Sequence, residues 1–158
     1  MKSLFEYQGD KIECMAASLA HFVATTAEDR LDWCPATDEK SQTRLVMQQV
    51  SECVAVNRYT AALLRGETPT HIPGWREAPA ISQDAQEQLV ASGQELAAAV
   101  RALDEEALTR VYPHVRGPLS GEIVMELLHR NMAYHAGQIN MIQLLTGDTE
   151  FHVLPTWV

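Results

Sequence analysis

The chain has 158 residues, of which 46% are hydrophobic and 21% charged, the composition of an ordinary soluble globular protein. With 12 basic against 21 acidic residues the formal net charge is −9, which repels a phosphate backbone and argues against nucleic acid as a partner. No apolar run approaches the roughly 20 residues needed to span a bilayer, so the sequence predicts no membrane association.

The length predicts one domain over residues 1–158, and the abundance of Ala, Leu, Gln and Glu predicts that it is all-α. The cysteines are odd in number and lack CxxC spacing, which argues against a disulfide framework: Cys14, Cys34 and Cys53. The N-terminus lacks the basic start and apolar stretch of a signal peptide. Together these features predict a cytoplasmic protein.

The first two predicted helices occupy the N-terminal part of the chain. Apolar residues recur at helical spacing over residues 10–28, and Asp10 with Glu13 resembles a capping box at the start of that segment. A second periodic segment covers residues 41–65 and stops at Gly66, a typical C-terminal breaker.

A long loop over residues 67–80, which contains Trp75, separates the second helix from the third. The third helix is predicted to begin at Ser82, and Gly93 within it would allow a close approach by another helix. A short element is predicted over residues 104–110.

The last helix is predicted to run without interruption from its N-cap at Ser120 to Gly147. At 100° per residue its apolar residues collect on one arc, with Asn131, His135 and Gln138 at the centre: Val124, Leu127, Leu128, Tyr134, Ile139, Ile142 and Leu145. Glu126, His129, Arg130, Ala133 and Asn140 are predicted to face solvent. The apolar residues of the tail that follows predict that it docks on the domain: Phe151, Val153, Leu154 and Trp157.

Four amphipathic helices with one long connection between the second and third predict an up-down four-helix bundle. Polar groups at the centre of a buried stripe cost free energy unless they are bound. One interpretation of the central residues of the last helix is therefore a hydrogen-bonded network that fixes helix register, and the other is a functional site. On the second helix, Gln49, Glu52 and Asn57 are the candidates to meet His135, and a carboxylate with an imidazole could bind a divalent metal.

The order of short motifs along the chain resembles the DinB/YfiT-like superfamily. The segment Tyr-His-Ala-Gly-Gln-Ile at residues 134–139, followed by Gln-Leu-Leu-Thr-Gly-Asp at residues 143–148, is similar to the last-helix signature of that family. Residues 31–35 (Leu-Asp-Trp-Cys-Pro) and 61–66 (Ala-Ala-Leu-Leu-Arg-Gly) add to the resemblance, which covers nearly the whole chain. It implies a four-helix bundle.

The resemblance also implies a metal site. In the family three histidines, one on the second helix and two spaced by four on the last, typically bind a divalent metal. Some members use the metal to activate thiol cofactors such as mycothiol or bacillithiol. By position, His135 matches the final ligand, Asn131 stands where the other last-helix histidine would be, and Glu52 takes the second-helix position, or Gln49 if the register differs. Gln49 and Gln138 are the candidates for contacting a bound cofactor.

Two functions follow, and whether the chain is an enzyme stays open between them. The first is a homodimeric bundle with a degenerate Glu/Asn/His metal site that binds a small molecule or serves a structural role. The second is an enzyme that uses Zn²⁺, Ni²⁺ or Mn²⁺ with a low-molecular-weight thiol, or a metal-activated water. The first is favoured because an amide in place of imidazoles loses good Zn²⁺ or Ni²⁺ ligands. The homodimer is expected from the family habit and from apolar helical surface in excess of what one bundle consumes.

Overall fold

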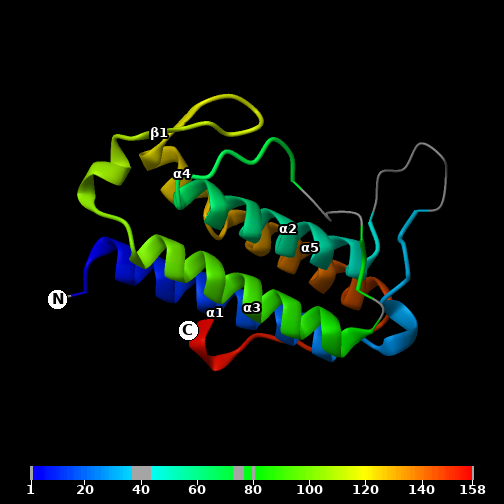
Figure 1. The fold of residues 1–158 in the computed structure, drawn as a ribbon. Helices are drawn as coiled ribbons and strands as arrows, with labels where there is room; N and C mark the ends of the chain where they lie inside the picture. The colour runs from blue at the N-terminus through cyan, green and yellow to red at the C-terminus, as the bar shows by residue number, and fades with distance from the viewer. Residues whose placement is uncertain (1, 37–43, 73–76, 80, 158) are drawn as a thin grey trace.

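The computed structural model describes residues 2–36, 44–72, 77–79 and 81–157. Four long helices, α1 (Leu4–Thr25), α2 (Val46–Leu64), α3 (Ser82–Arg101) and α5 (Arg130–Leu145), pack side by side, and the shorter α4 (Gly121–Leu127) leads into α5 (Figure 1). This arrangement confirms the all-α class. The predicted start of the second helix at residues 41–43 and the loop residue Trp75 lie outside the described residues.

Helices α2 and α3 run in the same direction. Asn57 of α2 hydrogen-bonds to Ser92 of α3, and further along both helices Arg65, at the end of α2, pairs with Glu95. Figure 1 shows the chain returning along the bundle between the two helices. The expectation of a simple up-down order is therefore wrong at this connection, because a long loop can cross the bundle and need not make a hairpin.

The ends of α1 and α5 meet, so these two helices also run in the same direction. The Gln143 side chain, near the end of α5, is buried and its Nε2 donates to the Phe22 carbonyl at 3.1 Å and to the Thr26 hydroxyl at 3.1 Å. These contacts give the buried Gln143 Nε2 its hydrogen-bond partners and join the last turn of α5 to the last turn of α1.

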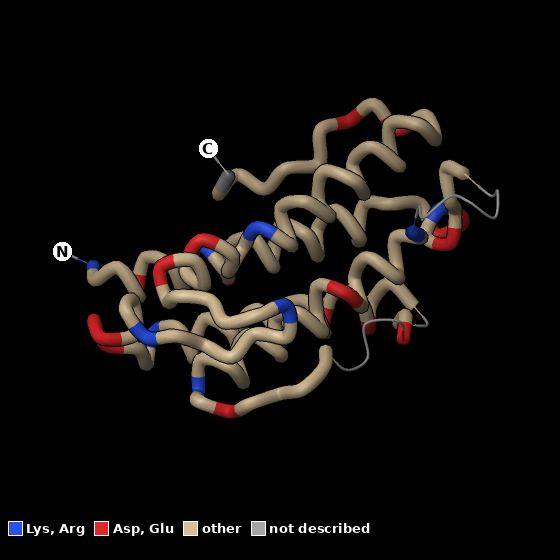
Figure 2. Tube along the Cα trace, turned by 90° about the horizontal axis from the view of Figure 1, so that it is seen from above, with Lys and Arg blue, Asp and Glu red and all other residues tan. Residues whose placement is uncertain are grey.

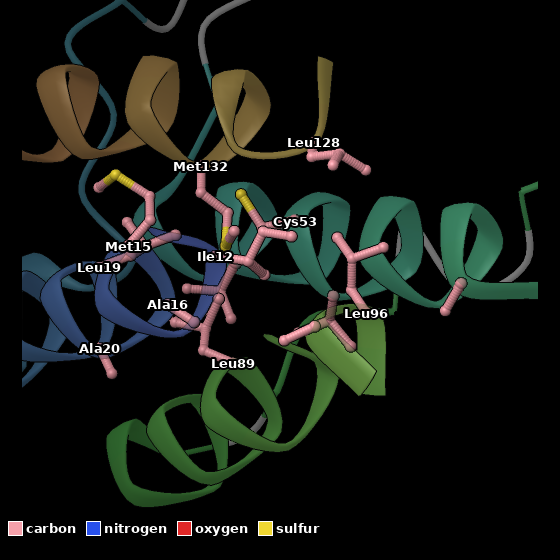
Figure 3. Packing of buried hydrophobic residues seen from close by; sticks show 14 of the residues in the cluster. Ile12, Met15, Ala16, Leu19, Ala20, Cys53, Leu89, Leu96, Leu128 and Met132 are labelled. Atoms are coloured by element: carbon pink, nitrogen blue, oxygen red, sulfur yellow. The ribbon is translucent and has the colours of Figure 1, made fainter. Parts of the chain in front are cut away.

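The core lies where the four long helices converge. In Figure 3, the side chain of Met132 from α5 reaches toward Ile12 of α1, and Cys53 of α2 and Leu89 of α3 belong to the same cluster. All four side chains are fully buried. Burial also raises the pKa of the Cys53 thiol, which makes it a packing residue and not a nucleophile.

Helix α1 begins earlier than predicted. Ser3 caps it, since its hydroxyl accepts from the Glu6 backbone N–H while the Glu6 carboxylate accepts from the Ser3 N–H. Asp10 and Glu13, predicted to cap the helix, lie within it and bind the Arg101 guanidinium at 2.9 and 2.7 Å. The two carboxylates therefore join the N-terminal half of α1 to the last residue of α3.

Glycine positions explain two boundaries and one close contact. Gly66 and Gly147 have positive φ angles, +85° and +96°, and end α2 and α5 as predicted. Gly93 confirms the predicted close approach, because a Cβ added there would lie 2.4 Å from Ala16 Cβ on α1.

The predicted last helix is two helices. The 3₁₀ turn η2 (Glu105–Leu108) and the short antiparallel strands β1 (Val111–Tyr112) and β2 (Leu119–Ser120) precede α4. Gly121 opens α4 directly against η2, and its N–H donates to the Arg110 carbonyl at 2.8 Å. Because α4 is held by η2 and β2 while α5 is held by α1 and α2, the chain breaks at Leu128 and His129. Ser120 is the N-cap, as predicted.

The orientation of α5 differs from the predicted one. Its buried residues are Met132, His135, Ala136, Ile139, Ile142 and Gln143. His135 is at the edge of this face, whereas Leu127, Tyr134 and Leu145, predicted to be buried, are 40%, 64% and 58% exposed. His129 and Asn140, predicted to face solvent, are half-buried. The buried face is thus rotated by roughly 80° from the predicted arc, at 100° per residue.

The C-terminal tail docks beside α1. Val153 and Leu154 are half-buried, and the Cys14 thiol approaches the Thr156 hydroxyl at 3.6 Å. Phe151, predicted to take part, is exposed. The tail prediction is therefore confirmed in part.

Two surface properties bear on possible partners. Lysine and arginine positions are scattered among aspartate and glutamate positions along the trace (Figure 2). None of the helices in the described part of the chain has the length and apolar character required to cross a membrane.

Candidate functional site

A cavity of about 580 Å³ opens between α2 and α5. It combines charged, amide and imidazole groups with an apolar wall from α5. Its lining residues are Pro35, Arg44, Gln49, Glu52, Tyr134, His135, Gln138, Met141, Ile142 and Leu145.

His135 is the buried polar residue at the centre of the site, with 2% of its surface exposed. Its Nδ1 lies 3.2 Å from Gln49 Oε1. The Gln49 Nε2 donates to the Arg44 carbonyl at 3.0 Å, which leaves Gln49 Oε1 facing His135, so Oε1 must accept a hydrogen bond from the Nδ1–H of His135. A neutral His135 is therefore protonated on Nδ1 and carries an unshared electron pair on Nε2.

Glu52 faces this electron pair. Its Oε2 lies 3.6 Å from His135 Nε2, and Nε2 has no hydrogen-bond partner within the described part of the chain. Two acceptors facing each other at this distance need a proton or a cation between or beside them. The Arg44 guanidinium contacts Glu52 Oε2 and supplies a positive charge at the rim.

The electrostatics keep His135 neutral at physiological pH. Burial lowers the pKa of His135 to about 4, and the nearby Arg44 cation acts in the same direction. The Gln138 side chain opposes both effects on the pKa, because an amide oxygen can accept from a protonated ring, although neutral His135 Nε2 has no hydrogen-bond partner among the described residues. The site thus presents an unprotonated imidazole nitrogen beside an arginine-paired carboxylate.

Gln138 and Tyr134 form one wall of the cavity. The Gln138 Nε2 donates to the Tyr134 hydroxyl at 3.0 Å, and the Tyr134 ring meets the His135 ring edge-on at a centroid distance of 5.2 Å. Tyr134 is 64% exposed, so this wall borders solvent.

The structure brings together most, but not all, of the residues singled out in the sequence. Glu52, Gln49, His135 and Gln138 all line the cavity. Asn131 is half-buried one turn before His135, its Oδ1 has no hydrogen-bond partner among the described residues, and it does not line the cavity.

Asn57, the third candidate on α2, has a structural role. Its amide is buried and donates to the Ser92 hydroxyl at 3.1 Å and toward the Met132 sulfur at 3.4 Å. Because these contacts join α2 to α3 and α5, Asn57 belongs to the core.

Arg44 is the charged residue of the cavity that the sequence pattern did not predict. It precedes α2, so helical periodicity gives no information on where its side chain points. A basic residue two turns before Glu52 was the available signal, but only the fold of the segment leading into α2 brings the two side chains into contact.

The donor set fits a metal ion poorly. Two tetrahedral ligands at about 2.1 Å from zinc lie about 3.4 Å apart, close to the separation of Glu52 Oε2 and His135 Nε2. However, no group of three or more histidine, cysteine, aspartate or glutamate side chains suited to a metal occurs among the described residues. Arg44 adds a positive charge on the same carboxylate oxygen.

Comparison of the chain with protein-family models gives no match, and comparison with curated proteins gives no match either. The cavity between α2 and α5 is therefore the feature of the molecule that indicates its function.

Proposed function

We propose that this chain is a small-molecule-binding protein with a DinB-like bundle and a degenerate metal site. The observation that carries the proposal is His135 Nε2, a buried acceptor that lacks a partner among the described residues and borders a cavity of about 580 Å³. Buried polar atoms are usually satisfied, so an unsatisfied one at a cavity favours a ligand that satisfies it.

The chemistry of the cavity indicates the class of ligand. A group that donates a hydrogen bond, such as an amine, hydroxyl or thiol, would satisfy His135 Nε2 and could also approach Glu52. A carboxylate would instead face another carboxylate and an unshared electron pair. Met141, Ile142 and Leu145 offer an apolar surface for the rest of the ligand.

A divalent-metal enzyme acting with a low-molecular-weight thiol is the second candidate. The 3.6 Å separation of Glu52 Oε2 and His135 Nε2 favours it, because one ion could bridge them. Titration of untagged protein with Zn²⁺, Ni²⁺ or Mn²⁺ by calorimetry tests this candidate. Binding at one ion per chain that is lost in Glu52→Gln would support it over the metal-free site.

The proposed ligand class is tested with a matched set of probes: hexylamine, hexanol, hexanethiol and hexanoate. NMR titration is expected to show that the three donors shift the His135 imidazole resonances, whereas hexanoate does not. Glu52→Gln should abolish the shifts, because its amide can itself donate to His135 Nε2 and fill the vacant hydrogen bond. His135→Ala should also lose binding, and should lower the free energy of unfolding by about 1 to 3 kcal/mol because Gln49 Oε1 loses its donor.

Glu95→Gln is the matched control. Glu95 is also a partly exposed carboxylate paired with arginine, but it joins α3 to Arg65 and does not line the cavity. This variant should keep the response to the probes. If no probe binds the wild-type chain while His135→Ala still lowers stability, the His135 cluster is structural and the proposal is wrong.

A further inference from the structure

The cavity between α2 and α5 contains two charges of opposite sign beside a neutral acceptor. The Arg44 guanidinium contacts Glu52 Oε2, and both side chains line the cavity. The same carboxylate oxygen lies 3.6 Å from His135 Nε2, which has no hydrogen-bond partner among the described residues. A ligand with a single charge can complement only one member of this ion pair, whereas a ligand with two opposite charges can complement both.

The three groups lie at different depths in the cavity. The exposed fraction of the side chain rises from 3% for His135 to 22% for Glu52 and 37% for Arg44. The imidazole is therefore at the floor and the guanidinium at the mouth. A ligand that satisfies His135 Nε2 must point its hydrogen-bond donor inward, so a second polar group on the ligand comes to lie near Arg44.

The distance between the two ends is short enough for one small molecule. Adding an ordinary charge-assisted contact of about 2.8 Å to the 3.6 Å between Glu52 Oε2 and His135 Nε2 places the Arg44 guanidinium at most about 6.4 Å from the imidazole. Each hydrogen bond to a ligand itself spans about 2.8 Å, so the two ligand groups must be carried by neighbouring carbon atoms. An α-amino acid carries its ammonium and its carboxylate in this relation.

The apolar wall of the cavity follows His135 along α5. Ile142 lies seven residues after His135, which is about 10.5 Å along the helix axis, and Met141 and Leu145 line the cavity beside it. Ile142 is buried, but Met141 and Leu145 are 54% and 58% exposed. A ligand side chain of several carbon atoms would cover this wall and remove apolar surface from water.

We propose that the cavity binds free α-amino acids with long apolar side chains. The inference rests on the proposed function, because it names the ligand class of the same cavity. The ligand ammonium lies between Glu52 and His135, its carboxylate pairs with Arg44, and its side chain packs on Ile142. An ammonium nitrogen can lie about 2.8 Å from both acceptors, because they are only 3.6 Å apart. A guanidinium has five N–H donors, so Arg44 can hold Glu52 and the ligand carboxylate together.

Ligands that lack one of the two charges fit less well. A simple amine satisfies His135 Nε2 but competes with Arg44 for Glu52 and offers the guanidinium nothing in exchange. A simple carboxylate pairs with Arg44 but leaves His135 Nε2 without a donor. The zwitterion replaces each charge contact that it disturbs.

L-Norleucine is the probe, because it is pentylamine with an added carboxylate and hexanoate with an added amine. NMR titration of the full chain, followed at the His135 imidazole, gives the dissociation constants. L-Norleucine is expected to bind at least about tenfold more tightly than pentylamine, and hexanoate is expected not to shift the imidazole resonances. L-Alanine lacks three methylene groups and should bind about fiftyfold more weakly than L-norleucine, at about fourfold per methylene.

Arg44→Met tests the carboxylate contact. It removes the charge, while the backbone carbonyl that accepts from Gln49 Nε2 is retained. The measured quantity is the ratio of the pentylamine and L-norleucine dissociation constants within each variant, which should fall from at least about ten to about one. Arg58→Met is the matched control, because Arg58 also pairs with a carboxylate, that of Glu95, but does not line the cavity. This variant should keep the wild-type ratio.

The outcomes separate this inference from the proposed function. If pentylamine binds and L-norleucine binds no more tightly, the amino-acid assignment is overturned while the binding function stands. A preference for L-norleucine that survives in Arg44→Met also overturns the assignment. If neither molecule shifts the His135 resonances, the proposed function and the inference are overturned together.

Discussion

Gly121→Ala is expected to lower the free energy of unfolding by at least about 3 kcal/mol, because the new methyl group would overlap backbone atoms. A Cβ at this position would lie 1.7 Å from the Ala107 carbonyl oxygen and 2.8 Å from its carbon. No rotation of a side chain can relieve a clash with backbone, so α4 must separate from η2. Denaturant unfolding monitored by circular dichroism measures the effect.

Gly137→Ala is the control for this prediction. The substitution is chemically identical and also lies in a helix, but its Cβ enters open space. In dilute protein it should raise stability by about 0.5 to 1 kcal/mol through the better helix propensity of alanine. Equal effects of the two substitutions would show that the contact between α4 and η2 does not constrain the fold.

The second large effect is a loss of stability on acidification that depends on His135. Its pKa is about 4 in the folded chain, against an ordinary value of 6.5. The unfolded chain therefore binds a proton more readily, so the contribution of this residue is fully present above pH 6.5 and is lost as the pH falls toward 4. A shift of this size corresponds to about 3 kcal/mol.

The contribution of His135 to the free energy of unfolding is obtained as the difference between the wild-type chain and a variant that lacks the imidazole. Chemical denaturation of the wild-type chain and His135→Gln at a series of pH values gives two profiles, in which the titration of other groups is common to both. The wild-type chain should lose about 3 kcal/mol more than the variant over this range. His71→Gln, which removes an exposed imidazole, should retain the wild-type profile. Parallel profiles for wild type and His135→Gln would mean that His135 is not held neutral by burial.

The candidate site was partly predictable because its central members share a simple signal. A histidine within an apolar helical stripe must be buried, and a carboxylate or an amide on the neighbouring helix is its natural partner. Glu52 and Gln49 do lie beside His135. The position of Arg44 and the lack of a hydrogen-bond partner for His135 Nε2 among the described residues were not predictable. They depend on how the segment before α2 packs and on the orientation of the Gln49 amide.

Periodicity determined that the chain is helical and where α2 and α5 end, because propensity and glycine conformation act within a few residues. It could not determine the rotation of α5. The helix has two apolar faces, one against the bundle and one exposed. The predicted arc contained residues of both faces, so its centre fell between them. Hydrophobic spacing records how much apolar surface a helix carries, but not which neighbour covers it.

The break between α4 and α5 and the shared direction of α2 and α3 were likewise decided only by tertiary contacts. No glycine or proline marks the break at Leu128 and His129, which results from the docking of Gly121 on η2. A long loop permits either direction for the helix that follows it, and the two pairs Asn57 with Ser92 and Arg65 with Glu95 occur together only when α2 and α3 run in the same direction. The sequence by itself therefore determined the helical class and most of the residues that meet at the site, while packing between distant segments decided how the helices are divided, oriented and joined.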